Sequence, residues 1–121
     1  MKIVNKFKNA FRGIGLALQD ISIRMQCLCF VLINAICLIL RVSVQDFVLV
    51  WVVSGSVIVS EMFNTCIERL CDVVQPEHDE RIRYIKDLSA GAVLVSCLFA
   101  ALIGCTILIK YVGGLLCTMM F

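Results

Sequence analysis

Apolar positions follow two patterns along this chain, a helical stripe at its start and then three long apolar stretches. In residues 1–24 the apolar side chains recur at steps of three and four residues, which is the period of a helix with one apolar face; they are Ile3, Phe7, Ala10, Phe11, Ile14, Leu18 and Ile21. Basic residues fall mostly on the other side. The pattern predicts an amphipathic helix that lies on the surface of an anionic membrane leaflet.

The three apolar stretches cover residues 25–44, 47–71 and 88–109. A membrane-spanning helix needs about 20 mostly apolar residues, so each stretch is long enough to cross a bilayer. The only strongly polar segment between them is residues 72–87. We therefore predict an all-α integral membrane protein, a single domain of three transmembrane helices preceded by an amphipathic surface helix.

Composition supports this class. The 121 residues are 61% hydrophobic and 17% charged, whereas soluble domains are about half apolar and a quarter charged. Eight cysteines lie in or beside the apolar stretches, and none has a neighbouring His or Cys at zinc spacing. We interpret them as small buried apolar residues rather than as disulfides or metal ligands. We expect residues 1–24 to carry no signal peptide, because their basic start leads into further charges.

Lys and Arg residues predict the orientation in the membrane, because short cytoplasmic loops carry an excess of them. Nine of the eleven lie in the N-terminal segment or in and beside the 72–87 loop. The other two are Arg41, after the first span, and Lys110, after the third. The N-terminus and the 72–87 loop are therefore predicted to be cytoplasmic, where ATP is present, and the C-terminus external.

The second span carries acidic residues that are unusual at membrane depth. With 100° per residue, Glu61, Asn64, Glu68 and Asp72 fall within an arc of about 80° and form a stripe about 16 Å long. Such a stripe could hold Mg²⁺, act as a general base on a buried hydroxyl, or relay protons in a transporter. It could also be a polar seam between helices, with the carboxylates paired to Arg69, Arg81 or Lys86. Spacing alone does not choose among these functions.

A second group of residues lies where the polar loop meets the third span. Lys86 and Asp87 come just before the third span, which begins with the small residues Ser89, Ala90, Gly91 and Ala92. Small residues let another helix approach closely, which would bring Lys86 near the acidic stripe. Beside Mg²⁺ and carboxylates, a Lys can bind a phosphate group. Alone, it is a common anchor at the membrane surface.

Together these residues resemble the signature of the prokaryotic diacylglycerol kinase family. They read Glu61-Met-Phe-Asn64-Thr-Cys-Ile-Glu68-Arg-Leu-Cys-Asp72 and, after the loop, Lys86-Asp87-Leu-Ser-Ala-Gly91-Ala-Val. The family pattern is E-x-x-N-[ST]-x-I-E-x-x-x-D, followed fourteen residues later by K-D and small residues, and the spacing here matches throughout. The resemblance implies a homotrimer of the bacterial inner membrane, with active sites shared between neighbouring subunits.

The resemblance also implies residue roles. The catalytic residues would be Glu61, Asn64 and Lys86. The Mg²⁺ ligands would be Asp20 and Glu68. Nucleotide contacts would come from Asp20, Glu68, Glu77, His78, Asp79, Lys86 and Asp87, and lipid-substrate contacts from Glu61, Arg24 and Ala90. The chain departs from the family at Asp20, where the pattern has Glu, at Gln26, where relatives have a carboxylate or His, and at His78-Asp79, where they tend to have Tyr-His.

The implied activity is phosphorylation of a lipid alcohol, either diacylglycerol or undecaprenol, with ATP as co-substrate and Mg²⁺ as cofactor; nucleic acid is not an expected partner. The Ala-Gly-Ala-Val start of the third span leans toward undecaprenol. Two other classes stay open on the residues alone. One is a small proton-coupled transporter or channel subunit that uses the Glu61 carboxylate, and the other is a non-catalytic assembly factor in which the stripe is a seam.

Overall fold

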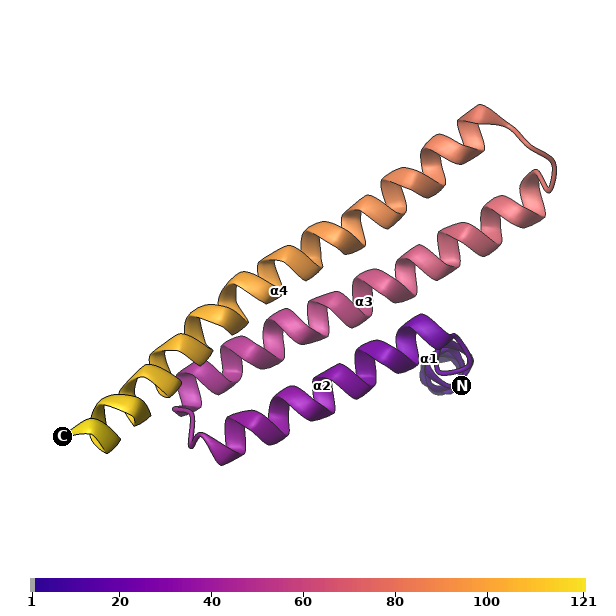
Figure 1. Cartoon of the computed structure of the whole chain (residues 1–121). Coiled ribbons are helices and arrows are strands. Elements are labelled where there is room, and N and C mark those ends of the chain that lie inside the picture. The colour runs from indigo at the N-terminus through magenta and orange to yellow at the C-terminus, as the bar shows by residue number, and fades with distance from the viewer. Residues whose placement is uncertain (1) are drawn as a thin grey trace.

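Residues 2–121 are described by a computed structural model and form four α-helices. These are α1 (Lys2–Ala17), α2 (Ile21–Ile39), α3 (Val44–Val74) and α4 (Glu80–Met120). In Figure 1, α2, α3 and α4 lie side by side, whereas α1 turns away beside the start of α2 and is seen nearly end-on. The helices α2, α3 and α4 are each long and apolar enough to cross a membrane. The predicted all-helical fold with three candidate spans is confirmed.

The polar connection before α4 is shorter than the 72–87 loop predicted from the sequence. Only residues 75–79 are non-helical, because α3 continues to Val74 and α4 starts at Glu80. Asp79 caps α4, since its carboxylate accepts the backbone N–H of Arg81 at 2.8 Å. Lys86 and Asp87 therefore lie on the second turn of a helix rather than in a loop. At its other end, α4 runs eleven residues past the predicted boundary at residue 109.

The N-terminal boundaries also differ from the prediction. The helix expected over 1–24 is divided: α1 ends at Ala17, and residues 21–24 belong to α2. The cause is Asp20, which caps α2 by accepting the backbone N–H of Ser22 at 2.9 Å.

The turn between α2 and α3 lies earlier than the break predicted between the spans 25–44 and 47–71. Arg41 has a φ of 52°, and its N–H donates to the carbonyl of Leu38 while the N–H of Val42 donates to that of Cys37. This is a Schellman ending, which stops α2 at Ile39 instead of residue 44. Val42 packs against the buried cluster of Cys37, Val50 and Ile107, as an apolar residue at this position often does. Ser43 then caps α3.

One line of residues on α3 faces the neighbouring helices. Val50, Val57, Asn64 and Cys71 are buried and recur every seven residues, which is the spacing of a coiled-coil seam. Most other large apolar side chains of α2, α3 and α4 are exposed on the isolated chain. Such surfaces suit lipid or neighbouring subunits and do not suit water.

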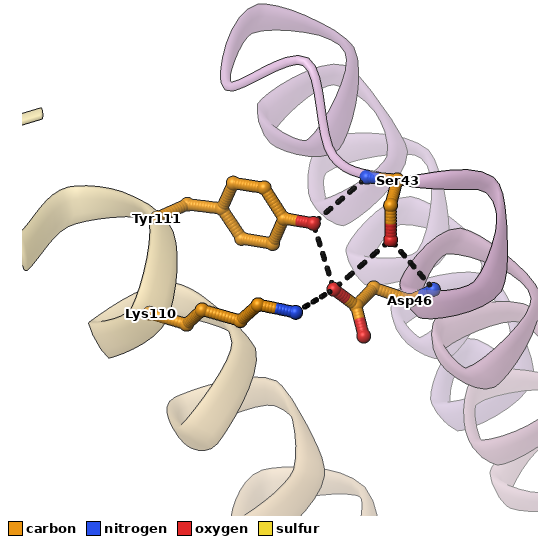
Figure 2. Close-up of polar contacts among 4 residues, drawn as sticks. All are labelled: Ser43, Asp46, Lys110 and Tyr111. Atoms are coloured by element: carbon orange, nitrogen blue, oxygen red, sulfur yellow. Dashed lines mark hydrogen bonds and ion pairs between the residues drawn. The ribbon is translucent and has the colours of Figure 1, made fainter. Parts of the chain in front are cut away.

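Polar side chains join α3 to α4 at the end of the bundle that carries the α2–α3 turn (Figure 2). Asp46 Oδ2 accepts hydrogen bonds from Lys110 at 2.8 Å, Tyr111 at 2.7 Å and the Ser43 hydroxyl at 3.1 Å. The Tyr111 oxygen in turn accepts the backbone N–H of Ser43 at 2.9 Å. Tyr111 therefore ties α4 to both the cap and the first turn of α3.

Replacing Tyr111 by Phe removes both of these contacts and leaves the ring in place. We expect the unfolding temperature of the detergent-solubilised protein to fall by about 5 °C, because a bond to an ionised carboxylate is lost. The matched control is Tyr84→Phe, since Tyr84 is 68% exposed. Equal unfolding temperatures for the two variants, measured by circular dichroism, would show that the cluster does not stabilise the hairpin.

Candidate active site

Helices α3 and α4 form an antiparallel hairpin, with the contacts around Asp46 at one end. The acidic stripe of α3 meets the first turns of α4 at the other end. The ammonium group of Lys86 donates a hydrogen bond to Oδ1 of Asp72 and forms an ion pair with it. The Lys86 side chain stays 35% exposed. An ammonium group has three donors, so this ion pair leaves donors for an anionic ligand. One of the ion pairs that the seam hypothesis named, between a stripe carboxylate and Lys86, is therefore present.

A chain of hydrogen bonds crosses from α4 to α3 next to the ion pair of Lys86 and Asp72. The hydroxyl of Ser89 donates to Oδ1 of Asn64 at 2.7 Å, and both residues are 8% exposed. The amide nitrogen of Asn64 donates to Oε1 of Glu68 at 3.3 Å. Glu68 itself is exposed. These hydrogen bonds thus engage one carboxylate oxygen of Glu68 and leave the other oxygen available to a ligand.

Glu61 lies one turn before Asn64 on the same side of α3 and is half-buried. No ion pair joins it to a cation in residues 2–121. The preceding residue, Ser60, contacts α4 through a hydrogen bond with Ser96, with 2.9 Å between the hydroxyl oxygens. The Glu61 carboxylate is therefore available for a ligand.

The connection 75–79 and the start of α4 carry the predicted nucleotide contacts. Asp79 accepts two hydrogen bonds from the guanidinium of Arg81, at 3.1 and 2.8 Å. These bonds, the backbone N–H of Arg81 and the charge of its guanidinium lower the pKa of Asp79 to about 2, so this side chain is a carboxylate at physiological pH. His78 Nε2 lies 2.9 Å from Oε1 of Glu80, and both side chains are 75% exposed. Glu77 is exposed.

The remaining predicted residues lie on the flanks of this site. Asp87 is exposed, and within residues 2–121 its one ion-pair partner is the guanidinium of Arg83, at 3.8 Å. Arg24 and Ala90 are exposed on α2 and α4. Asp20 keeps one carboxylate oxygen engaged as the cap of α2. Asp87 and Ala90 thus lie on α4, Arg24 lies on α2, and Asp20 stands at the cap before α2.

A groove lies where α1 and the start of α2 meet α3, with a volume of about 370 Å³. Its walls include Ala10, Gly13, Ile14, Ile23, Met62 and Thr65. The α3 residues that line it, from Met62 to Arg69, come from the same turns as the acidic stripe. The stripe carboxylates themselves do not line the groove, so an apolar compound in it would lie along the neighbouring side of the same α3 turns.

The carboxylate oxygens suit Mg²⁺, which takes one or two protein carboxylates together with water and substrate phosphates. Within residues 2–121, no group of three or more His, Cys, Asp or Glu side chains converges on one point. Within those residues, one chain alone therefore builds no such metal cage. The second carboxylate oxygens of Glu68 and Asp20, which accept no hydrogen bond from the described residues, are of the kind that binds Mg²⁺.

Comparison with known proteins gives the family. The family model described as prokaryotic diacylglycerol kinase matches residues 8–108, which extend from α1 into the last third of α4. A relative is the undecaprenol kinase of Bacillus subtilis (strain 168), 27% identical over 66 residues. That match covers 54% of this chain and 54% of the relative, so the chain spans about half the length of the curated relative it matches. No solved structure matches the chain.

The chain therefore belongs to the prokaryotic diacylglycerol kinase family, and the resemblance inferred from its motifs is confirmed. With three helices long enough to span a bilayer, it is a multi-pass membrane protein.

The polar role of Ser89 was not predicted from the sequence, where Ser89 counts only as a small residue at a close helix contact. Its position three residues after Lys86, on the same side of α4, was the available signal for a polar role.

Proposed function

We propose that this protein is a lipid kinase that transfers the γ-phosphoryl group of ATP to the hydroxyl of a membrane lipid alcohol. The observation that supports this most is the convergence of the α3 stripe with Lys86 and Ser89 of α4. It joins the residues of the family signature at one end of the hairpin, in a chain that matches the family along most of its length.

In this proposal each residue has a defined task. Glu61 accepts the proton of the lipid hydroxyl as the oxygen attacks the γ-phosphorus, and the bond from that phosphorus to the bridging oxygen breaks to release ADP. Lys86, held by Asp72, neutralises charge on the phosphoryl group. Glu68 and Asp20 would hold Mg²⁺ on the phosphates, where it supplies charge stabilisation. Glu77, His78, Asp79 and Asp87 would contact the nucleotide.

The lipid would reach Glu61 from the bilayer through the groove under α1. The groove volume of about 370 Å³ is in the range of small-molecule sites, and apolar side chains form most of its walls. Arg24 and Ala90 would contact the lipid. Either diacylglycerol or undecaprenol has the required hydroxyl, and the relative named undecaprenol kinase favours the second.

We also propose that the active unit is a homotrimer. On the isolated chain, Glu68 is exposed, Glu61 is half-buried, and Asp20 lies away from α3, at the cap of α2. The exposed apolar sides of the three long helices offer surfaces for neighbouring copies. A neighbouring subunit would thus complete a site that one chain leaves open.

The proposed orientation places the N-terminus and the α3–α4 connection in the cytoplasm of a bacterial inner membrane. We expect alkaline phosphatase fused after Phe121 to be active in a Gram-negative host, because that enzyme requires export, while a green fluorescent protein fusion there stays dark. The opposite reporter pattern would place the C-terminus in the cytoplasm and the stripe away from ATP.

Transfer of labelled phosphate from ATP in mixed micelles tests the function and its acceptor. The purified protein should label one or both of diacylglycerol and undecaprenol, and the label should depend on Mg²⁺. An undecaprenol-specific enzyme labels that lipid at least tenfold faster. Absence of label on both lipids, with folded protein, would contradict the proposal.

A further inference from the structure

The hydroxyl of Ser89 makes a buried contact between α3 and α4, whereas most hydroxyls of these helices bond within their own helix. In this structure helical hydroxyls usually donate back to the carbonyl four residues earlier on their own helix, as do those of Ser56, Ser60, Thr106 and Thr118. Ser89 instead donates across the interface, to Oδ1 of Asn64 at 2.7 Å. Because both residues are 8% exposed, water reaches this contact poorly.

The direction of this bond fixes which way the Asn64 amide faces. An ionised carboxylate only accepts hydrogen bonds, so Glu68 requires the amide nitrogen of Asn64, and that nitrogen lies 3.3 Å from its Oε1. The amide oxygen must then face α4, where it needs a donor. The Ser89 hydroxyl is that donor. With the amide turned over, two oxygens would face each other at Glu68.

We propose that Ser89 is a positioning residue that acts through Asn64 to hold Glu68 in the orientation that binds a divalent cation. The proposal rests on the proposed function of Glu68 as a metal ligand. Partners that orient a metal-binding side chain typically contribute 10- to 100-fold in affinity. An Ala at position 89 would leave the buried Asn64 oxygen without a donor and free the amide to rotate.

The test is the affinity for Mn²⁺, measured by electron paramagnetic resonance in the presence of a non-hydrolysable ATP analogue and without lipid alcohol. Ser89→Ala should raise the Mn²⁺ dissociation constant about tenfold. Ser89→Thr keeps the donor and should remain within about threefold of the parent. The matched control is Ser96→Ala, which also removes a hydroxyl contact between α3 and α4, at 2.9 Å from Ser60, but lies deeper along α4.

A double-substitution experiment separates positioning from a general effect on packing. In an Asn64→Ala background the hydrogen-bonded chain from Ser89 through Asn64 to Glu68 is already broken. Ser89→Ala should therefore not weaken Mn²⁺ binding further. The proposal is overturned if Ser89→Ala binds Mn²⁺ as Ser96→Ala does, or if its full loss persists without Asn64. If the parent transfers phosphate to lipid while either result holds, only the role of Ser89 fails. If the parent binds no Mn²⁺ with nucleotide, the proposed metal site fails as well.

Discussion

Replacing Glu61 by Gln should lower the rate of phosphoryl transfer by about 10²- to 10⁴-fold, which is the usual contribution of a general base. Gln has nearly the same shape but cannot take the proton of the lipid hydroxyl. Glu61 has no ion-pair partner in the described chain, so its replacement breaks no salt bridge that holds α3 to α4. Oligomer content by crosslinking, nucleotide affinity and turnover are measured on one preparation.

Oligomer content and nucleotide affinity show whether Glu61 acts as a general base or as a structural residue. Assembly and nucleotide affinity should equal those of the parent, since Lys86, Asp72 and the Ser89–Asn64–Glu68 chain are untouched. The matched control is Glu80→Gln, at an exposed carboxylate beside His78. Turnover of Glu61→Gln within a few-fold of this control would remove the general-base role. A loss of assembly in step with turnover would favour a polar seam.

Replacing Glu68 by Gln should weaken binding of Mg²⁺ with nucleotide by more than the 10- to 100-fold typical of a residue that merely orients a ligand. The Gln side chain has one oxygen in place of two and carries no charge. High Mg²⁺ should restore part of the activity, because the lost contact is with the cation. Titration of activity with Mg²⁺ measures this, and Asp20→Asn should shift the curve less, since one oxygen of Asp20 already caps α2.

An unchanged Mg²⁺ titration for Glu68→Gln would contradict the metal assignment. In that case the contact with Asn64 would be the role of Glu68, and the residue would belong to the interface between α3 and α4. Glu80→Gln is again the matched control and should titrate as the parent does. Nucleotide affinity without divalent cation should be similar in all variants.

The three long helices were predictable because apolar runs of this length have few other solutions, whereas their ends depend on single residues. Asp20 and Asp79 both stand before helical runs, and both cap a helix. The ending of α2 was harder to predict, because the residue with positive φ is Arg41 rather than the Gly that usually marks such an ending.

The acidic stripe was predictable from the period of a helix, but its partners were not. Spacing along α3 places Asn64 and Glu68 on one side, and the structure joins them at 3.3 Å. That Asp72 pairs with Lys86, and Asn64 with Ser89, depends on the register between α3 and α4. This register is set by packing along the whole hairpin, including the cluster around Asp46, and no local pattern encodes it.

The most direct measurement of the central claim uses the purified protein in sealed liposomes that contain the lipid alcohol accepted in micelles and a proton gradient. Labelled ATP and Mg²⁺ are added outside. A lipid kinase transfers the label into the lipid fraction, loses this activity in Glu61→Gln, and leaves the gradient intact. A protein that collapses the gradient in a Glu61-dependent way and never labels the lipid would contradict the account and establish proton transport instead.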